Sequence, residues 1–297
     1  MGAQLRIIRR RIRSVQSTMK ITRAMELIAA SRIVKAQRRV EEAKPYALRI
    51  SEAIRELAGV TEVMASFPLL QEREIRTVGV LLVTSDRGLA GGYNSAVIKV
   101  AETLLRQIQS AGKGFRLHLA GKKGISYFRF RGYAIASSVT GVSDKPAYDD
   151  AAAIGRRMMA EFEAGEVDQV IVCYTDYRTA TQQVAAHTQV LPIARGEVAA
   201  TDGPTALYEF EPEPADILSL LLPRYVITVV YAAMLESSAA EHAARRRAMK
   251  VATDNAQELI GALTRDANRQ RQAEITTEIM DIIGGAEALR KQEAAAR

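Results

Sequence analysis

The residues best suited to chemistry lie in a glycine-rich turn, Ser85 to Asn94, directly after a β-branched run. Dinucleotide folds hold phosphate on such a turn, so Ser85 and Asp86 are candidates for a phosphate-binding or catalytic site. The turn reads G-x-x-G-G, and neither it nor the turn at 121–124 has the spacing of a Rossmann fingerprint or a P-loop. Ser85 and Asp86 have no evident histidine partner, and no carboxylate pair stands out. The pattern favours a tight turn over nucleotide binding, and we predict no catalytic residues.

Cysteine and histidine usage gives no metal-binding pattern. Cys173 is the only cysteine and lies in the apolar run Val170 to Tyr174, which predicts a buried structural thiol. A single cysteine cannot form an internal disulfide, which is consistent with a reducing compartment. His118, His187 and His242 are far apart and have no neighbouring ligands at metal spacing. We therefore expect neither a metal site nor a cofactor.

Positive charge is concentrated near the N-terminus. The chain has 297 residues and a net charge of +7, whereas its first 44 residues hold twelve Lys or Arg against three Glu, a net charge of +9. A second basic cluster comprises Arg245, Arg246, Arg247 and Lys250. Such runs are often solvated helix faces, but they also suit an acidic partner, either nucleic acid or an acidic protein surface. The residues alone leave these alternatives open.

The element that must carry the first basic segment is a long helix. Between Leu5 and Leu57, apolar or small residues recur at alternating steps of three and four, and only Thr22 and Glu26 break the pattern. A repeat averaging 3.5 residues predicts a helix that winds around a partner. The stripe consists of Leu5, Ile8, Ile12, Val15, Met19, Thr22, Glu26, Ala29, Ile33, Ala36, Val40, Ala43, Ala47, Ile50, Ile54 and Leu57.

The partner is predicted at the other end of the chain. From Ala215 to Ile283 the composition again favours helix, and Gly284 and Gly285 are expected to end it. Three apolar blocks flank a patch of small residues, Ser237 to Ala244, that would let another backbone approach closely. The blocks are Leu218, Leu222, Tyr225, Val229 and Ala232; Met249, Ala252, Ala256, Leu259 and Leu263; and Ile275, Ile279 and Ile282. We expect the two terminal helices to pack antiparallel.

The middle of the chain alternates strand and helix signals, which predicts an inserted, Rossmann-like α/β domain with a largely parallel sheet. Strands are expected at 77–84, 115–120, 133–137, 169–175 and 183–191, with helices ending near 110 and covering 122–131 and 148–163. The last two strands are expected to form a hairpin. The predicted organisation is an N-terminal coiled-coil helix at 1–59, the α/β domain at 75–195 and a C-terminal coiled-coil helix at 210–290.

Bulk composition fits this organisation. Hydrophobic residues make up 48% of the chain and aromatic residues 5%, with no Trp, which suits helical seams better than an aromatic stacking platform. The longest apolar run, Val226 to Leu235, is about half the ~20 residues that a membrane span needs. No signal peptide is evident. We expect a chain that does not cross a bilayer and stays where it is made.

Three motifs resemble the γ subunit of F-type ATP synthases, and the likeness runs almost end to end. They are Lys20–Arg32 (KITRAMELIAASR), Ser85–Asn94 (SDRGLAGGYN, with Ala90 where Cys is common) and Glu241–Ala256 (EHAARRRAMKVATDNA). The last continues in Arg271-Gln272, Ile275-Thr276, Glu278 and Gly284-Gly285. A regulatory cysteine pair of the chloroplast type is missing, so thiol control is not expected.

The resemblance implies a non-catalytic rotor shaft. Its coiled coil would turn inside a ring of three α and three β subunits. The α/β insert and the lower end of the rod would meet the ε subunit and the membrane-embedded c-ring. Proton-driven rotation would then drive ATP synthesis, or its reverse, at the β subunits. The resemblance also implies a peripheral position on the cytoplasmic face of the bacterial cell membrane, membrane association only through the complex, and no nucleic-acid partner.

The resemblance also suggests contact residues. Family β subunits carry an acidic loop that faces the shaft, so the nearby basic residues would make exposed, screened contacts with it. The expected β-contact set is Lys20, Arg23, Met25, Arg245, Arg246, Arg247, Lys250, Arg271, Gln272, Thr276 and Glu278. Glu211 would lie at the foot, near the c-ring and ε.

Two other functions were weighed. A basic coiled-coil protein that binds nucleic acid is supported only by the +9 segment, and it would bind with a steep salt dependence. A nucleotide-dependent enzyme built on residues 75–195 would require tight binding of ATP or NAD by that segment.

Overall fold

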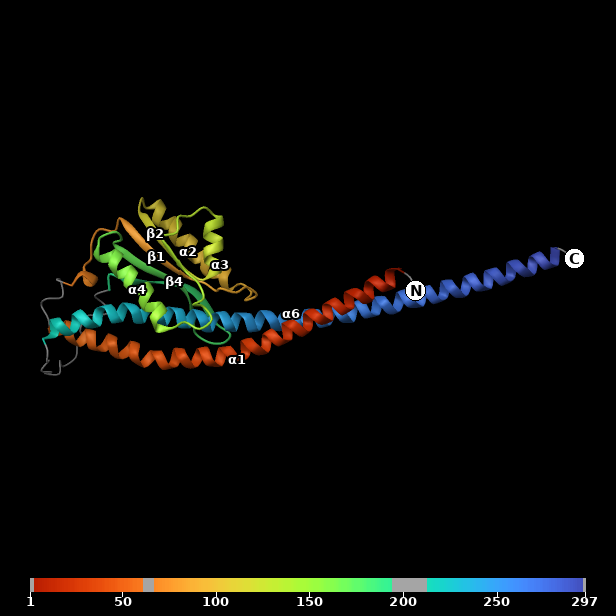
Figure 1. The fold of residues 1–297 in the computed structure, drawn as a ribbon, viewed down its shortest axis with the longest axis horizontal. Coiled ribbons are helices and arrows are strands. Elements are labelled where there is room, and N and C mark those ends of the chain that lie inside the picture. Colours follow the sequence, from red (N-terminus) through yellow and green to blue (C-terminus); the bar gives the residue numbers. More distant parts are fainter. Residues whose placement is uncertain (1–2, 61–66, 194–212, 296–297) are drawn as a thin grey trace. The chain divides into compact units, whose positions relative to one another are not determined.

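A computed structural model describes residues 3–60, 67–193 and 213–295, which form two units (Figure 1). Unit 1 is Met1–Leu27 with Ala248–Arg297, and unit 2 is Ile28–Arg247. The elements in order are α1 (Ala3–Val60), a 3-10 turn (Pro68–Leu70), β1 (Thr77–Val83), α2 (Tyr93–Ser110), β2 (Gly114–Ala120), α3 (Lys122–Phe130), β3 (Ser137–Val139), α4 (Tyr148–Glu163), β4 (Gln169–Tyr177), β5 (Gln183–Leu191) and α6 (Pro214–Ala295).

The sheet of unit 2 has the strand order β3-β2-β1-β4-β5. β1 pairs in parallel with β2 and β4, and β3 pairs in parallel with β2. β5 returns antiparallel to β4, so the hairpin prediction is confirmed. Strand β1 reads TVGVLLV and is buried along nearly its whole length, as a parallel strand covered on both faces requires.

Helices cover both faces of the sheet (Figure 1). On one face, Val80 and Leu82 of β1 pack with α2 and α3 through residues such as Leu105 and Phe128. On the other, Leu81 belongs to a core that includes α4 and parts of α1 and α6. The predicted α/β fold class is confirmed. The residues that α1 and α6 contribute to the core around Leu81 are Ile50, Ile54, Leu57, Leu218, Leu222, Val226, Ile227, Val230, Ala233 and Met234.

In unit 2, α1 and α6 pack antiparallel. Ala36 and Val40 of α1 share a cluster with Leu235 and Ala239 of α6, whereas residues later in α1 share a core with residues earlier in α6. Every position of the predicted stripe from Ala29 to Leu57 is buried or half-buried. The heptad pattern therefore identified the packed side of α1 correctly.

In unit 1, the same stripe continues less deeply. Leu5 is buried, while the positions from Ile8 to Glu26 are half-buried. The break at Thr22 has a local explanation, because its Oγ1 lies 2.8 Å from Oγ1 of Thr253 on α6. A hydroxyl pair thus replaces an apolar contact at this level of the seam.

Two predicted boundaries were wrong. The strand expected at 133–137 is β3, Ser137–Val139, because Tyr133 instead closes α3: its N–H donates to the carbonyl of Phe128 and its ring packs on Phe128. The expected stop at Gly284-Gly285 is absent, and α6 continues to Ala295. A Cβ at either glycine would meet nothing within 4 Å, so no close packing requires glycine at these positions.

Helix α6 contains a window apolar enough, by length and composition, to span a membrane, with 44% of that window buried. Packing offers another account of these apolar residues. Leu218, Leu222, Val226 and Val230 are at most 1% exposed in the core beneath the sheet. We therefore assign the apolar start of α6 to the core of unit 2.

Candidate functional site

The glutamate and first arginine of the C-terminal motif form an ion pair inside unit 2. Arg245 Nη2 donates to Glu241 Oε1 at 2.6 Å, and the two side chains are only 9% and 1% exposed. Burial raises the pKa of Glu241, against the opposing effect of the guanidinium. Arg245 also donates to the carbonyl oxygen of Gly88 at 3.3 Å. The expectation of an exposed, screened contact is therefore wrong for Arg245, whose charge is neutralised within the chain.

One turn away on α6, Ser238 and His242 hold the loop that precedes α4. Ser238 Oγ donates to the carbonyl oxygen of Asp144 at 3.2 Å, and His242 Nε2 lies 3.4 Å from the same oxygen. Arg245 Nη1 lies 3.5 Å from His242 Nδ1, and since arginine only donates, Nδ1 is the acceptor and Nε2 carries the proton. Arg32 of α1 donates to the Asp144 carboxylate. This loop thereby joins α1 to α6.

The 85–94 turn is folded by its own polar side chains. Asn94 Oδ1 accepts from the N–H of Ser85 at 3.0 Å. The Asp86 carboxylate accepts backbone N–H groups from a second loop and from the start of α3, namely Lys122, Gly141 and Ser143. Leu89 and Gly91 adopt positive φ values of 63° and 56°. The tight-turn prediction is confirmed, with Asp86 serving as a backbone acceptor.

The neighbouring Gly121 has a packing role. Its φ is +104°, and a Cβ there would lie 2.1 Å from the carbonyl oxygen of Thr84. Gly124 donates its N–H to Thr84 Oγ1 at 3.0 Å. The glycines at 121–124 therefore let the ends of β1 and β2 approach each other, which accounts for them without a phosphate ligand.

The turn docks on the small-residue patch of α6. Ala90 and Tyr93 form a cluster with Ala240, which is fully buried. Burial beside Glu241 raises the pKa of the Tyr93 hydroxyl, so this side chain is neutral. The patch therefore receives side chains of the 85–94 turn, and the backbone N–H of Thr175 on β4 donates to Ser237 Oγ of the patch at 3.3 Å.

We name Asp86, Asp144, Glu241, His242 and Arg245 the docking cluster. Its members bond to one another, to backbone and to Arg32 of α1, so the cluster attaches the α/β insert to α6. Sequence reasoning missed Asp144 because a lone aspartate between glycine, serine and lysine looks like an ordinary loop residue.

The other basic residues of the second cluster differ from Arg245. Arg246 is exposed. Arg247 is also exposed, but it donates to the carbonyl oxygen of Ala180 at 2.7 Å and to the side chain of Gln183, so it holds the tip of the β4–β5 hairpin. In unit 1, exposed Lys250 lies 3.3 Å from Asp254.

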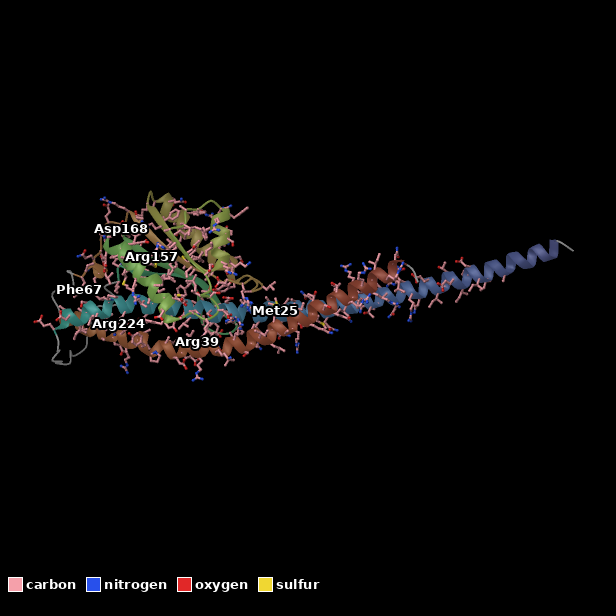
Figure 2. All side chains as sticks on the ribbon, viewed as in Figure 1. Met25, Arg39, Phe67, Arg157, Asp168 and Arg224 are labelled. Atoms are coloured by element: carbon pink, nitrogen blue, oxygen red, sulfur yellow. The ribbon has the colours of Figure 1, made fainter. Side chains whose placement is uncertain are left out.

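The predicted N-terminal contact residues lie on the α1 segment of unit 1 (Figure 2). Lys20 is exposed and Met25 is half-buried. The Arg23 side chain is 64% exposed and lies 4.0 Å from Glu26, a weak surface pair. Because Thr22 meets Thr253, these residues lie at the level of Lys250 on the two-helix seam. The structure thus brings Lys20, Arg23, Met25 and Lys250 to one level.

The remaining predicted residues on α6 form a separate group in unit 1. Arg271, Gln272, Thr276 and Glu278 are all exposed. So is the predicted apolar block of Ile275, Ile279 and Ile282. Together with the neighbouring Met280 and Ile283, these side chains are 47–72% exposed. This apolar stripe is therefore free for contact outside the chain. Glu211 lies outside the described residues.

Sequence comparison places these features in a known family. A family model described as ATP synthase matches residues 4–289. Proteins described as ATP synthase gamma chain are similar over nearly their whole length. The chain is 49% identical to that of Frankia casuarinae over 97% of this chain and 99% of the relative. It is 46% identical to that of Mycolicibacterium smegmatis over the same shares.

Solved structures give the same picture of the fold. The chain resembles a chain of the central stalk and c-ring structure of Tetrahymena thermophila mitochondrial ATP synthase, with 26% identity and a TM-score of 0.61, covering 78% of this chain and 99% of that one. A chain from the Euglena gracilis mitochondrial ATP synthase, in a structure of OSCP, F1 and c-ring, shares the fold at 15% identity, with a TM-score of 0.69 over 99% and 97% of the two chains.

Proposed function

The chain belongs to the ATP synthase gamma-chain family, and from this premise we propose how it works as the central rotor shaft of the enzyme. The shaft couples proton-driven rotation of a c-ring to ATP synthesis, or to its reverse, at β subunits. The chain itself supplies no catalytic residue in this proposal. It would sit at the cytoplasmic face of a bacterial membrane and associate with that membrane only through the complex.

The shaft can drive three sites differently only if it presents different faces to them, because a partner's equilibrium shifts only by a difference in contact free energy. Two features of unit 1 support such asymmetry. One is the level that carries Lys20, Arg23, Met25 and Lys250, and the other is the exposed stripe on α6. We propose that the first level contacts an acidic loop of a β subunit through screened charges. Arg246, which is exposed in unit 2, is proposed as a separate β contact.

The exposed apolar stripe on α6 is the single observation that best supports placement inside a ring of subunits. Five large apolar side chains there remain 47–72% exposed, and soluble helices rarely leave so many uncovered together. We propose that the α and β subunits surround this stripe and that Arg271, Gln272, Thr276 and Glu278 provide its polar contacts with β. Glu211, outside the described residues, is proposed from the family resemblance as a contact for the c-ring and ε.

Arg245 and Arg247 are left out of the proposed β contacts. Arg245 is buried with Glu241, and Arg247 is bonded to the β4–β5 hairpin. We propose instead that both residues make the shaft rigid by fixing the α/β insert to α6. A rigid attachment would transmit torque applied to the insert into the helices.

Met25→Lys tests the proposed β contact. An added charge on this half-buried surface should bind the acidic loop too strongly and uncouple hydrolysis from pumping. An extra contact of about 1 kcal/mol would change an equilibrium roughly fivefold. In membranes bearing the variant enzyme, we expect ATP-driven proton pumping per ATP hydrolysed to fall by roughly that factor.

Two control variants separate charge from shape. Met25→Leu keeps the apolar volume, and Gln16→Lys adds the same charge at an exposed position of α1. Both should pump normally. Unchanged pumping in Met25→Lys, or an equal loss in Gln16→Lys, would contradict the assignment of Met25.

A further inference from the structure

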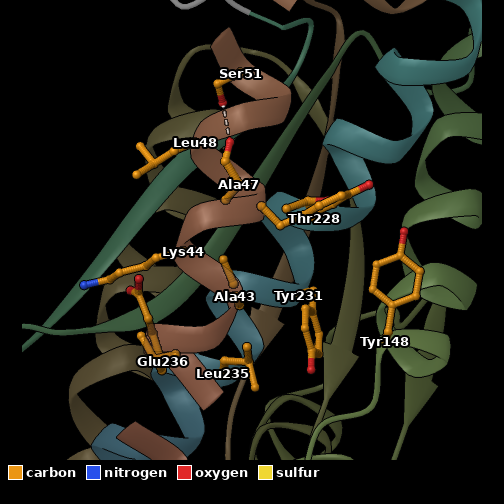
Figure 3. A pocket seen from close by; sticks show the side chains of 13 residues that line it. Ala43, Lys44, Ala47, Leu48, Ser51, Tyr148, Thr228, Tyr231, Leu235 and Glu236 are labelled. Atoms are coloured by element: carbon orange, nitrogen blue, oxygen red, sulfur yellow. Dashed lines mark hydrogen bonds between the residues drawn. The ribbon is translucent and has the colours of Figure 1, made fainter. Parts of the chain in front are cut away.

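A cavity of about 580 Å³ opens between α1, α6 and the start of α4 in unit 2 (Figure 3). Its volume lies within the range of small-molecule sites in proteins, roughly 300–1,000 Å³. The walls are mainly alanine, leucine and tyrosine side chains, with Lys44 and Glu236 as the charged residues. The coupling proposed above makes no use of this cavity.

The cavity exists because small residues occupy the seam there. Ala43 and Ala47 are the heptad positions of α1 at this level, and they face Thr228 and Ala232 of α6. Methyl groups and a hydroxyl do not fill the space that leucine or isoleucine fills at neighbouring levels. A second cavity of about 220 Å³ shares the walls formed by Ala47 and Glu236. The two helices are therefore loosely packed along this stretch.

The two sides of the cavity differ in chemistry. On one side, the rings of Tyr148 and Tyr231 meet edge to face at 5.7 Å between centroids and 77° between planes. On the other, the carboxyl group of Glu236 lies near the stem of Lys44 (Figure 3). A ligand with one apolar end and one polar end would match this division.

The polar side of the cavity carries one carboxyl group and one ammonium group, those of Glu236 and Lys44. Glu236 has Asp176 of β4 as an acidic neighbour and Lys44 of α1 as its basic one, while the neutral hydroxyl of Tyr174 also lies close. Burial, with help from Asp176, raises the pKa of Glu236 to about 7. Asp176 is already paired with Arg178, whose Nε lies 2.9 Å from its carboxylate, so Glu236 and Lys44 are the charged groups left beside the cavity. When Glu236 is ionised, an ammonium group in the cavity gains a direct partner in its carboxylate, whereas an anion is repelled by it.

We propose that the cavity is a binding site for a lipophilic primary amine. The ammonium group donates to the Glu236 carboxylate, and the apolar part lies between Ala43, Ala47 and the two tyrosine rings. A ring in the ligand would extend the edge-to-face pair of Tyr148 and Tyr231. Such a ligand would bridge α1 and α6 and oppose movement between them.

A series of three matched probes tests the proposal on the purified full-length chain. 4-Phenylbutylamine, 4-phenyl-1-butanol and 4-phenylbutyrate have nearly the same shape but carry positive, zero and negative charge. Isothermal titration at pH 8, where Glu236 is ionised, should show the amine binding about tenfold more tightly than the alcohol and the acid binding weakest. At pH 6, below the pKa of Glu236, the preference for the amine should shrink.

Three variants locate the site. Glu236→Gln should reduce amine affinity to within about twofold of alcohol affinity, whereas Glu42→Gln, an exposed change on α1, should alter nothing. Ala47→Leu should abolish binding of all three probes by filling the cavity. Ala43→Leu repeats this test from the next turn in case Ala47→Leu does not fold, and far-UV circular dichroism checks both. Equal affinity for amine and alcohol, unchanged amine binding in Glu236→Gln, or no binding at millimolar concentration would overturn the proposal.

Discussion

The two-helix seam has a different character in each unit, although both parts come from the same pair of helices. In unit 2, the stripe includes Ile50, Ile54 and Leu57 at 1–4% exposure, and the C-terminal motif of α6 begins with a buried ion pair. In unit 1, most stripe positions are half-buried, a threonine pair bridges the helices, and the lysines and Arg23 are exposed.

This difference indicates two roles within one family motif: attachment of the α/β insert and a proposed contact with a partner. Glu241 and Arg245 lie only a few residues before Lys250. Glu241 and Arg245 bond to each other in a buried ion pair, whereas Lys250 is exposed and accessible to a partner. Charge in the sequence therefore does not by itself identify a contact surface. Burial distinguishes the basic residues that attach the insert from those that we propose as contacts for another subunit.

The largest expected effect separates Arg245 from Arg246. Arg245→Ala leaves Glu241 buried without its counter-charge and should lower the free energy of unfolding by about 3–5 kcal/mol. Arg246→Ala, at the exposed neighbouring position, should change it by less than about 0.5 kcal/mol. Urea denaturation of the purified chain measures both. An equal loss of unfolding free energy in the two variants would contradict the different roles assigned to Arg245 and Arg246.

Apolar residues of α6 should divide in the same way. Leu222 is 1% exposed, so Leu222→Ala should cost about 2–5 kcal/mol of unfolding free energy. Ile279 is 49% exposed, and Ile279→Ala should stay within about 0.5 kcal/mol of the parent chain. A comparable cost at Ile279 in the isolated chain would mean that the stripe is already covered.

The buried histidines of unit 2 should make stability depend on pH. Burial lowers the pKa of His118 and His242 below the ordinary value of 6.5. The unfolded chain therefore binds protons near pH 6.5 that the folded chain resists, and stability should fall as the pH drops below that value. Each histidine contributes at most about 1.4 kcal/mol per pH unit.

The pH slope can be assigned with two variants. Between pH 7 and 5, His242→Gln should remove the contribution of His242 to the slope of unfolding free energy against pH. This holds whatever the substitution does to the unfolding free energy at pH 7. His118→Gln should remove the contribution of His118, because burial lowers the pKa of this ring as well. A slope that is unchanged in His242→Gln would contradict the neutral, buried state of that ring.

The smallest effect concerns the threonine pair of unit 1. Thr253→Val removes one partner of a 2.8 Å hydrogen bond and should cost about 1 kcal/mol. The double variant Thr22→Val/Thr253→Val should cost no more, because two valines restore an apolar contact. A double-mutant cycle by urea denaturation measures the coupling, and strictly additive losses would show that the hydroxyls do not interact.

Periodicity predicted the shaft helices well because it encodes which side of a helix is covered. The stripe from Leu5 to Leu57 is buried or half-buried at every position, including its two polar members. Periodicity alone could not show how far along α6 the packing against α1 extends. The block at Ile275, Ile279 and Ile282 looked like more seam, but the structure leaves it exposed.

The docking cluster could be predicted only in part because its bonds join distant segments. Arg245 bonds to Gly88, and Asp144 bonds to Arg32, across separations that no local pattern reveals. The motif at 241–250 indicated importance without indicating burial. Cys173, by contrast, was predicted correctly from its strand: it is fully buried, and burial raises its pKa to about 12.

Direct observation of rotation would test the central claim most sharply. The chain is assembled with α and β subunits fixed to a surface, and a bead is attached through a cysteine introduced at an exposed position of the insert, such as Arg129. On addition of ATP, the bead should turn in one direction in three steps per revolution. Hydrolysis of ATP with only random motion of a firmly attached bead would contradict the role of this chain as the shaft.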